Sequence, residues 1–319
     1  MNDFSELIGQ EQAVQFLKNA LETGNLSHAY LFSGPAGTGK KTAARIFAAT
    51  LLAGSDADAH IFLKDGVHPD LMVLTKPENR TVIGKDQISK ELEPWLAIKP
   101  YRASHKIAII AEAALMSLEA ANALLKTLEE PPLYAVIILV ADQAPLLETI
   151  VSRCQGVRFH PLTDGQLEKL LTGRGFSPEK SRQAARLAQG SPGTAVRFAA
   201  AGNFEENWDR VRQAIDNFAR GRQLAIFETA REMEKDAYLY TSMLEIILRD
   251  IYIYQTTHNE QLLAISANID IIKAVPDKSP EQIRSAMNNI AGLKYYYKTN
   301  VNPLLINTNI CYEVAAALK

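Results

Sequence analysis

The stretch Gly34-Pro35-Ala36-Gly37-Thr38-Gly39-Lys40 decides the fold of this chain. It follows a short apolar run over residues 29–32 and precedes a helical pattern over residues 40–52. A glycine-rich loop between a strand and a helix can wrap a phosphate with its backbone N–H groups, while the helix dipole and the lysine add positive charge. The context predicts a phosphate loop whose nucleotide-binding residues are Gly34, Gly37, Gly39 and Lys40.

Apolar runs and helical patterns alternate on both sides of this loop. Further strand-like runs cover residues 71–74, 107–110 and 136–140. Helical spacing of apolar residues covers 10–22, 88–98 and 118–129. Continuous apolar strands that alternate with helices are typical of a parallel sheet covered on both faces. The first half of the chain is therefore predicted to be α/β.

The strand signals stop near Pro161, and the rest of the chain is helical in pattern. Turns at Gly173-Arg174-Gly175 and Gly190-Ser191-Pro192-Gly193 separate short helices, and longer helical patterns follow Gly202. We predict three domains, namely an α/β phosphate-loop domain over 1–160, a small helical lid over 161–203 and an all-α domain over 204–319.

The bulk composition excludes several classes of protein. None of the apolar runs in the 319 residues reaches the roughly 20 residues that span a bilayer, and the N-terminus lacks a signal-peptide pattern. We therefore expect a cytoplasmic protein with no membrane partner. The net charge of −2 gives no global attraction to nucleic acid. The two cysteines, Cys154 and Cys311, cannot form a four-thiolate metal site.

The phosphate loop departs from its pattern at the residue after the lysine. A Ser or Thr hydroxyl normally binds Mg²⁺ at this position, but here it is Lys41, and Thr42 comes one residue late. One residue turns a side chain by about a third of a circle on a helix, so Thr42 does not simply substitute. An additional cation at this place also disfavours Mg²⁺.

The acidic motif that should complete the magnesium site is altered as well. The apolar run over residues 107–110 should end in an Asp that binds Mg²⁺ and a Glu that activates water, but it ends in Ala111 and Glu112. Glu112 is either a weak catalytic candidate or a surface or helix-capping carboxylate. Loss of two magnesium ligands favours little or no ATP hydrolysis by this chain.

The chain resembles the clamp-loader subunits of bacterial DNA polymerase III, a AAA+ family that includes delta-prime, gamma/tau and replication-factor-C type subunits. The resemblance is strongest to the delta-prime type. The matching residues are 8–11, 28–32, 66–70, 86–88, 120–132 with the sequence Ala-Ala-Asn-Ala-Leu-Leu-Lys-Thr-Leu-Glu-Glu-Pro-Pro, and 152–154 with the sequence Ser-Arg-Cys. The resemblance implies a AAA+ phosphate-loop domain, a lid and a helical collar domain over 204–319.

The resemblance also implies a role for Arg153. In that family the arginine of Ser-Arg-Cys is an arginine finger, which reaches the ATP held by a neighbouring subunit. A permanently charged, planar guanidinium can offset the charge that builds on a transferring phosphoryl group. The alternative is a salt-bridged arginine at the edge of the domain.

Other family features are missing. Motor subunits carry a polar sensor residue after the last strand, where this chain has Val140-Ala141-Asp142 without a clear equivalent. Their lid arginine lies in a Gly-Ser-x-Arg motif, but residue 193 here is glycine. Many members also carry a four-cysteine zinc module in the interval that corresponds to 51–67, which contains no cysteine, so we expect no zinc.

The sequence therefore predicts a clamp-loader subunit that hydrolyses little or no ATP and binds ATP or ADP weakly or not at all. The implied partners are gamma/tau and delta subunits, with the sliding clamp and primer–template DNA reached through the assembled complex and its polymerase holoenzyme. The alternative is an ATP-hydrolysing, gamma-like motor subunit in which Thr42 and Glu112 suffice.

Overall fold

The structure is a computed structural model that describes residues 4–64, 66–77, 80–142, 146–202, 204–265, 268–276 and 278–318. The chain divides into two compact units, Met1–Leu170 with Gly190–Gly193 and Leu171–Gln189 with Thr194–Lys319. The three-domain division stays a prediction, and Asn203 and Lys319, at which two of its domains end, lie outside the described residues.

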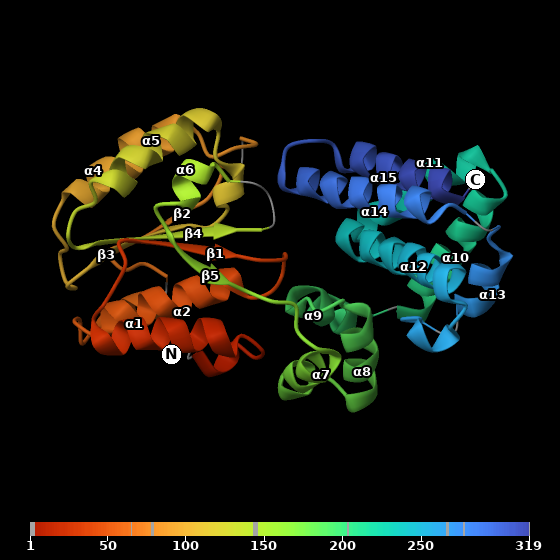
Figure 1. Cartoon of the computed structure of the whole chain (residues 1–319), viewed down its shortest axis with the longest axis horizontal. Coiled ribbons are helices and arrows are strands. Elements are labelled where there is room, and N and C mark those ends of the chain that lie inside the picture. The colour runs from red at the N-terminus through yellow and green to blue at the C-terminus, as the bar shows by residue number, and fades with distance from the viewer. Residues whose placement is uncertain are drawn as a thin grey trace. The chain divides into compact units, whose positions relative to one another are not determined.

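The first unit is built on a parallel sheet (Figure 1). Its strands are β1 (Ala29–Ser33), β2 (Leu71–Leu74), β3 (Lys106–Ile110), β4 (Ala135–Ala141) and β5 (Gln155–Arg158). They pair side by side in the order β2-β3-β4-β1-β5, and all four pairings are parallel. The predicted parallel α/β fold is confirmed, and β5 is an additional strand at the edge next to β1.

Helices cover both faces of this sheet (Figure 1). The helices α1 (Glu11–Thr23) and α2 (Lys40–Ala53) lie on one face, and α4 (Glu93–Ala97) and α5 (Leu118–Glu129) lie on the other. Side chains alternate between the faces of a strand, so Phe32 packs in the core with α1 and α2 while Leu31 packs in the core with α4 and α5. Two buried faces explain why the central strands β1, β3 and β4 are almost entirely buried and largely apolar.

The remaining elements of the first unit are short. They are 3₁₀ turns over Phe4–Glu6 and Ala113–Leu115, α3 (Ala59–Lys64), a π-helical turn over Gln87–Leu92 that runs into α4, and α6 (Glu148–Val151). The Ser117 hydroxyl accepts a hydrogen bond from Ala120 N and so caps α5 at its N-terminus. α5 ends at Glu129, directly before the Glu130-Pro131-Pro132 turn, because proline cannot continue a helix.

The rest of the chain is helical, as predicted. The first unit ends within α7 (Asp164–Gly173), and the second unit contains α8 (Pro178–Leu187) and most of α9 (Pro192–Ala200). The second unit continues with α10 (Phe204–Ala219), α11 (Gln223–Glu232), α12 (Ala237–Thr257), α13 (Ile269–Ala274), α14 (Pro280–Tyr295) and α15 (Pro303–Leu318). None of the described helices is both long and apolar enough to cross a membrane.

A tyrosine stabilises the packing of the second unit. The Tyr297 hydroxyl lies 3.1 Å from Thr241 Oγ1 and donates to Asn307 Oδ1 at 2.6 Å. The amide of the fully buried Asn307 donates to the carbonyl oxygen of Ala230 at 3.0 Å, so the cluster links α12 and α15 to α11. Burial raises the pKa of Tyr297 to about 12, which keeps its hydroxyl protonated and able to donate.

Replacing Tyr297 with phenylalanine should lower the free energy of unfolding by about 1–3 kcal/mol, because the buried Asn307 Oδ1 loses its donor. Denaturant titration measures this change. Tyr312→Phe is the matched control, since Tyr312 is 47% exposed, and its effect should lie within about 0.5 kcal/mol of zero. Equal effects of the two substitutions would contradict a structural role for the Tyr297 hydroxyl.

Candidate functional site

The phosphate loop follows β1 and is held in shape by close contacts at its glycines. Gly34 has a φ of 143°, and a Cβ there would lie 2.2 Å from the backbone oxygen of Phe159. Gly37 has a φ of 76°, and a Cβ there would lie 2.3 Å from the hydroxyl oxygen of Ser191. Gly39 precedes α2 in the left-handed conformation. Both backbone conformations favour glycine, and at Gly34 the nearby backbone also leaves no space for a side chain.

The turn over Gly190–Gly193 packs on this loop within the first unit. Gly193 N donates to the carbonyl oxygen of Gly37 at 3.2 Å. Residue 193 is the glycine that stands where a lid arginine was expected from the family pattern. The turn therefore contributes backbone contacts to the loop at this position and no cationic side chain.

Lys40, the first residue of α2, is only 3% exposed. Its ammonium donates to the carbonyl oxygens of Gly34 at 2.8 Å and Pro35 at 2.5 Å. It also forms an ion pair with Asp142, at 2.9 Å from Oδ1. An ammonium has three N–H donors, and these three oxygens are well placed to accept all of them.

Asp142 is the partner of Lys40 that the sequence reasoning missed. It directly follows β4, and β4 pairs with β1 so that Ala141 lies opposite Ser33. The carboxyl ends of neighbouring parallel strands meet at one edge of the sheet, which places Asp142 beside the start of the phosphate loop. The signal that points to it is a charged residue directly after a fully buried strand.

Lys41 and Glu112 form a second ion pair at the same edge. Lys41 Nζ lies 3.1 Å from Glu112 Oε1, and the Glu112 side chain is 18% exposed. Glu112 follows β3 after Ala111, and it precedes a short 3₁₀ turn without making a side-chain capping hydrogen bond. Of the alternatives for Glu112, helix capping is therefore wrong. Thr42 lies one residue beyond Lys41 on α2 and is exposed.

Arg153 lies just after α6 with its side chain 36% exposed. Its guanidinium donates to the carbonyl oxygen of Thr149 at 2.8 Å and forms an ion pair with Glu129 at 2.7 Å. These contacts fix the direction of the side chain at the surface. The neighbouring Cys154 is not a reactive thiol, since burial raises its pKa to about 11.

The segment over residues 51–67, which contains no cysteine, is joined to the sheet by an ion-pair network. Arg102 donates to Asp56 from Nε at 2.7 Å and from Nη2 at 3.0 Å, and it also pairs with Asp58 at 2.8 Å. These hydrogen bonds hold the pKa of Asp56 well below its usual range. The buried His68 Nε2 lies 3.1 Å from Asp56 Oδ2, and its Nδ1 accepts from Asp70 N.

Within the described part of the chain, no group of three His, Cys, Asp or Glu side chains is arranged to hold a metal ion. His60 lies exposed with its Nδ1 3.1 Å from the carbonyl oxygen of Ala57, and His68 belongs to the network with Asp56. The two histidines thus serve different local contacts. The expected absence of zinc stays a prediction.

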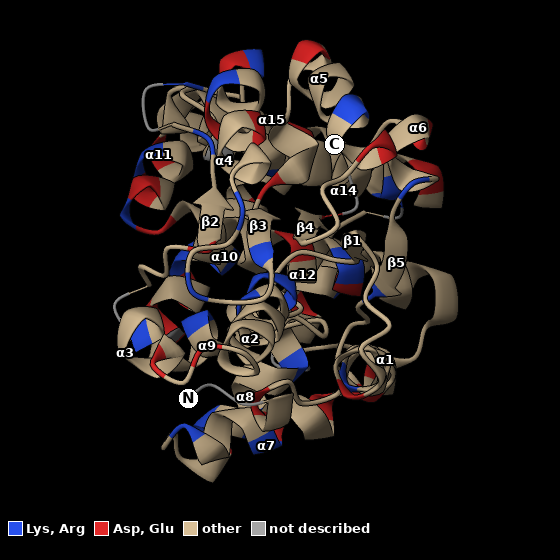
Figure 2. Ribbon diagram, turned by 90° about the vertical axis from the view of Figure 1, so that its left-hand side faces the viewer, with Lys and Arg blue, Asp and Glu red and all other residues tan. Residues whose placement is uncertain are grey.

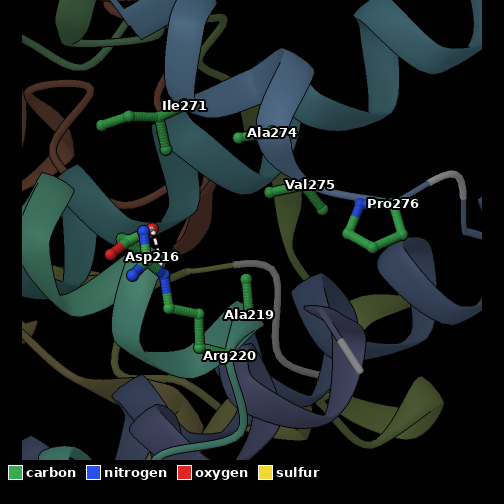
Figure 3. Close-up of a pocket in the computed structure, with 7 residues that line it drawn as sticks. All are labelled: Asp216, Ala219, Arg220, Ile271, Ala274, Val275 and Pro276. Atoms are coloured by element: carbon green, nitrogen blue, oxygen red, sulfur yellow. Dashed lines mark hydrogen bonds and ion pairs between the residues drawn. The ribbon is translucent and has the colours of Figure 1, made fainter.

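A small cavity of about 190 Å³ lies in the second unit between α10 and α13 (Figure 3). Its lining residues are Asp216, Ala219, Arg220, Ile271, Ala274, Val275 and Pro276. Asp216 and Arg220 are already paired with each other at 2.9 Å, so they do not present unsatisfied charge to a ligand. The cavity contains none of the phosphate-loop residues.

Figure 2 shows basic and acidic segments interspersed along the ribbons of the described elements, without a long basic stripe in that view. Binding of nucleic acid depends mostly on clustered Lys and Arg side chains that neutralise phosphates.

The sequence of this chain is similar to those of DNA polymerase III subunits. Residues 9–163 match the family model described as "DNA polymerase III, delta subunit". The tau subunit of DNA polymerase III from Bacillus subtilis is 35% identical over 181 residues, which are 53% of this chain and 31% of that subunit. The chain thus spans about a third of this longer relative.

Two solved structures are similar to the chain at low sequence identity. One is a gamma-subunit-related protein of DNA polymerase III from Thermotoga maritima, with a TM-score of 0.47, 17% identity, and coverage of 95% of this chain and 99% of that one. The other is a variant of the RuvB Holliday junction branch migration motor from Thermotoga maritima, with a TM-score of 0.48, 16% identity, and coverage of 85% and 87%.

Similarity to delta′ subunits extends over most of the chain. The delta′ subunit of DNA polymerase III from Bacillus subtilis is 31% identical over 274 residues, which are 80% of each chain. The delta′ subunit from Pseudomonas aeruginosa is 31% identical over 296 residues, which are 88% of this chain and 89% of that one. Because the similarity covers both the phosphate-loop unit and most of the helical unit, this chain belongs to the family of the delta′ subunits of DNA polymerase III.

Proposed function

We propose that the chain is a clamp-loader subunit that does not turn over ATP and that offers Arg153 to the ATP of a neighbouring subunit. The observation that carries the proposal is the pairing of the two loop lysines with carboxylates of the same chain. Lys40 pairs with Asp142 and Lys41 pairs with Glu112. A site whose phosphate-binding and metal-binding positions are satisfied internally is poorly suited to Mg²⁺-ATP.

The surroundings of Arg153 support its role as an arginine finger. A finger must be exposed enough to reach another subunit and rigid enough to lose little entropy on docking. Arg153 is partly exposed, while the Thr149 carbonyl and the Glu129 carboxylate orient its guanidinium. Glu129 lies at the end of α5, the helix with the longest stretch of family resemblance. A phosphate on a neighbouring subunit would replace or share the exposed Glu129 contact.

The second unit supplies an exposed apolar surface that is suited to subunit contacts. Leu224 and Phe227 on α11 are 70% and 49% exposed, and Leu305 and Tyr312 on α15 are 57% and 47% exposed. The Phe227 and Tyr312 rings contact each other edge to face at 6.3 Å. Apolar and aromatic side chains of this kind are enriched at the centres of protein interfaces. We propose that residues 204–319 form the collar contact with gamma/tau-type and delta-type subunits.

Three consecutive tyrosines of the second unit, Tyr295, Tyr296 and Tyr297, have different surroundings. Tyr295 and Tyr296 are 37% and 45% exposed, whereas the Tyr297 hydroxyl is hydrogen-bonded within its own unit.

In the assembly, the chain would help load a sliding clamp onto primer–template DNA in the cytoplasm. The support for these partners is the family membership and the tau-type relatives.

The purified chain should hydrolyse Mg²⁺-ATP no faster than its Lys40→Ala variant, because Lys41 and Ala111 stand at the two positions where magnesium ligands were expected. Steady-state phosphate release measures this rate. The same chain should raise ATP hydrolysis when it is added to gamma/tau-type and delta-type partners. Turnover by the chain alone that Lys40→Ala abolishes would overturn the proposal and identify an ATP-hydrolysing motor subunit instead.

A further inference from the structure

We propose that Asp142 sets the ligand specificity of the phosphate loop, because its carboxylate takes the place of the terminal phosphate on Lys40 and excludes nucleoside triphosphates. This inference deepens the proposed function, since it rests on the part in which the chain does not turn over ATP. Asp142 is the residue that prevents ATP from binding, and removal of its carboxylate is the change that would permit binding.

The first support is the geometry around Lys40. The loop retains its glycines, its left-handed backbone at Gly37 and its lysine, so the chemistry of a phosphate cradle is present. The oxygens of Gly34 and Pro35 belong to the loop itself. The Asp142 oxygen at 2.9 Å comes from outside the loop, from the end of β4, and it is an anion, like the phosphate oxygen that it replaces.

The second support is the state of the neighbouring charges. Lys41 places an ammonium 3.1 Å from Glu112, at the position where a hydroxyl would hold Mg²⁺. In these two pairs, the Asp142 carboxylate replaces the anionic triphosphate, and the Lys41 ammonium replaces the metal cation. An incoming triphosphate must displace the Asp142 carboxylate from Lys40, and it is repelled by that carboxylate at short range.

Burial distinguishes this pair from an ordinary surface ion pair. Lys40 is 3% exposed and Asp142 is 33% exposed, so water compensates the Lys40 charge poorly when Asp142 is neutralised. A variant without the carboxylate therefore carries a buried cation beside an intact phosphate cradle. Binding of an anion is the change that compensates this charge.

Binding of a fluorescent N-methylanthraniloyl ATP to Asp142→Asn and to the unaltered chain tests the proposal. We expect Asp142→Asn to bind at least tenfold more tightly, and we expect Lys40→Ala in the same background to remove the gain. Asp86→Asn is the matched control, because it changes the net charge equally at an exposed pair with Lys90. Equal affinity of Asp142→Asn and the unaltered chain would overturn the proposal.

A thermal melt supplies a readout that does not depend on the fluorophore. Without ligand, Asp142→Asn should melt at a lower temperature than the unaltered chain, and ATP should raise the melting temperature of the variant more. The rise in melting temperature that ATP causes in the variant should be the same in Mg²⁺ and in EDTA, because Lys41 stands where a magnesium ligand was expected. A gain that requires Mg²⁺, or a melting temperature that ATP leaves unchanged, would contradict the charge replacement. Asp142→Ser provides the same test if the asparagine variant fails to fold.

These measurements use the purified chain alone, so their failure is distinguishable from failure of the arginine-finger proposal. That proposal is tested by hydrolysis in the assembled ring, where Arg153 and a neighbouring subunit are required.

Discussion

Replacing Arg153 with alanine should slow ATP hydrolysis at the neighbouring subunit's site by about 10³–10⁵-fold, the range that arginine fingers supply in GTPases. The physical reason is that the guanidinium offsets charge that builds on the transferring phosphoryl group only in the transition state. The measurement is single-turnover hydrolysis by a reconstituted ring in which only the phosphate loop facing this chain is intact. Binding of ATP by that neighbour should change much less than the hydrolysis rate.

Two further substitutions make the test specific. Arg153→Lys keeps the charge but loses the planar fork, so it should restore only a small part of the rate. Arg158→Ala removes an exposed arginine on β5 and should leave hydrolysis within about twofold of the unaltered ring. An Arg153→Ala ring that hydrolyses ATP at the unaltered rate would show that the arginine is an edge salt bridge with Glu129 and nothing more.

Replacing Asp70 with alanine should cost about 3–5 kcal/mol of the free energy of unfolding. Asp70 is fully buried, and its carboxylate accepts from the backbone N–H groups of Tyr101 at 2.7 Å, Arg102 at 2.8 Å and Ala103 at 2.9 Å. Alanine leaves these three donors without their acceptor and disconnects the turn before β3. Denaturant titration near pH 7 measures the loss. Asp86→Ala, at an exposed pair with Lys90, should cost less than about 0.5 kcal/mol.

The cost of Asp70→Ala should also depend on pH. Burial raises the pKa of Asp70, but the three backbone hydrogen bonds outweigh burial and leave the pKa below its usual value of 3.8. A lowered pKa in the folded state means that the stabilisation is complete above 3.8 and is lost as the pH falls through the folded-state value. The difference between the two proteins should therefore shrink below pH 3.8. A difference that stays constant down to pH 2 would show that the charge of Asp70 contributes nothing.

Local sequence patterns were enough to locate most of the framework. The run over 71–74 and the helical pattern over 118–129 coincide with β2 and α5, because a continuous apolar run and an amphipathic helical spacing can each be recognised from neighbouring residues. The strand β5 was missed since Val157 is the one large apolar residue among its four, Gln155–Arg158, so it has no apolar run. The short α3, α6 and α13 lack enough turns to establish a period.

The candidate site shows a similar division. The sequence alone located the strand, the glycine loop and its lysine, the residues Lys41 and Ala111 where magnesium ligands were expected, and the Ser-Arg-Cys position of Arg153, since each of these depends on adjacent residues. Only the tertiary structure decided that Asp142 pairs with Lys40 and that Glu129 orients Arg153. The partners in each pair are distant in sequence. The parallel pairing of β4 with β1 brings Asp142 to the phosphate loop, and the contact between α5 and α6 brings Glu129 to Arg153.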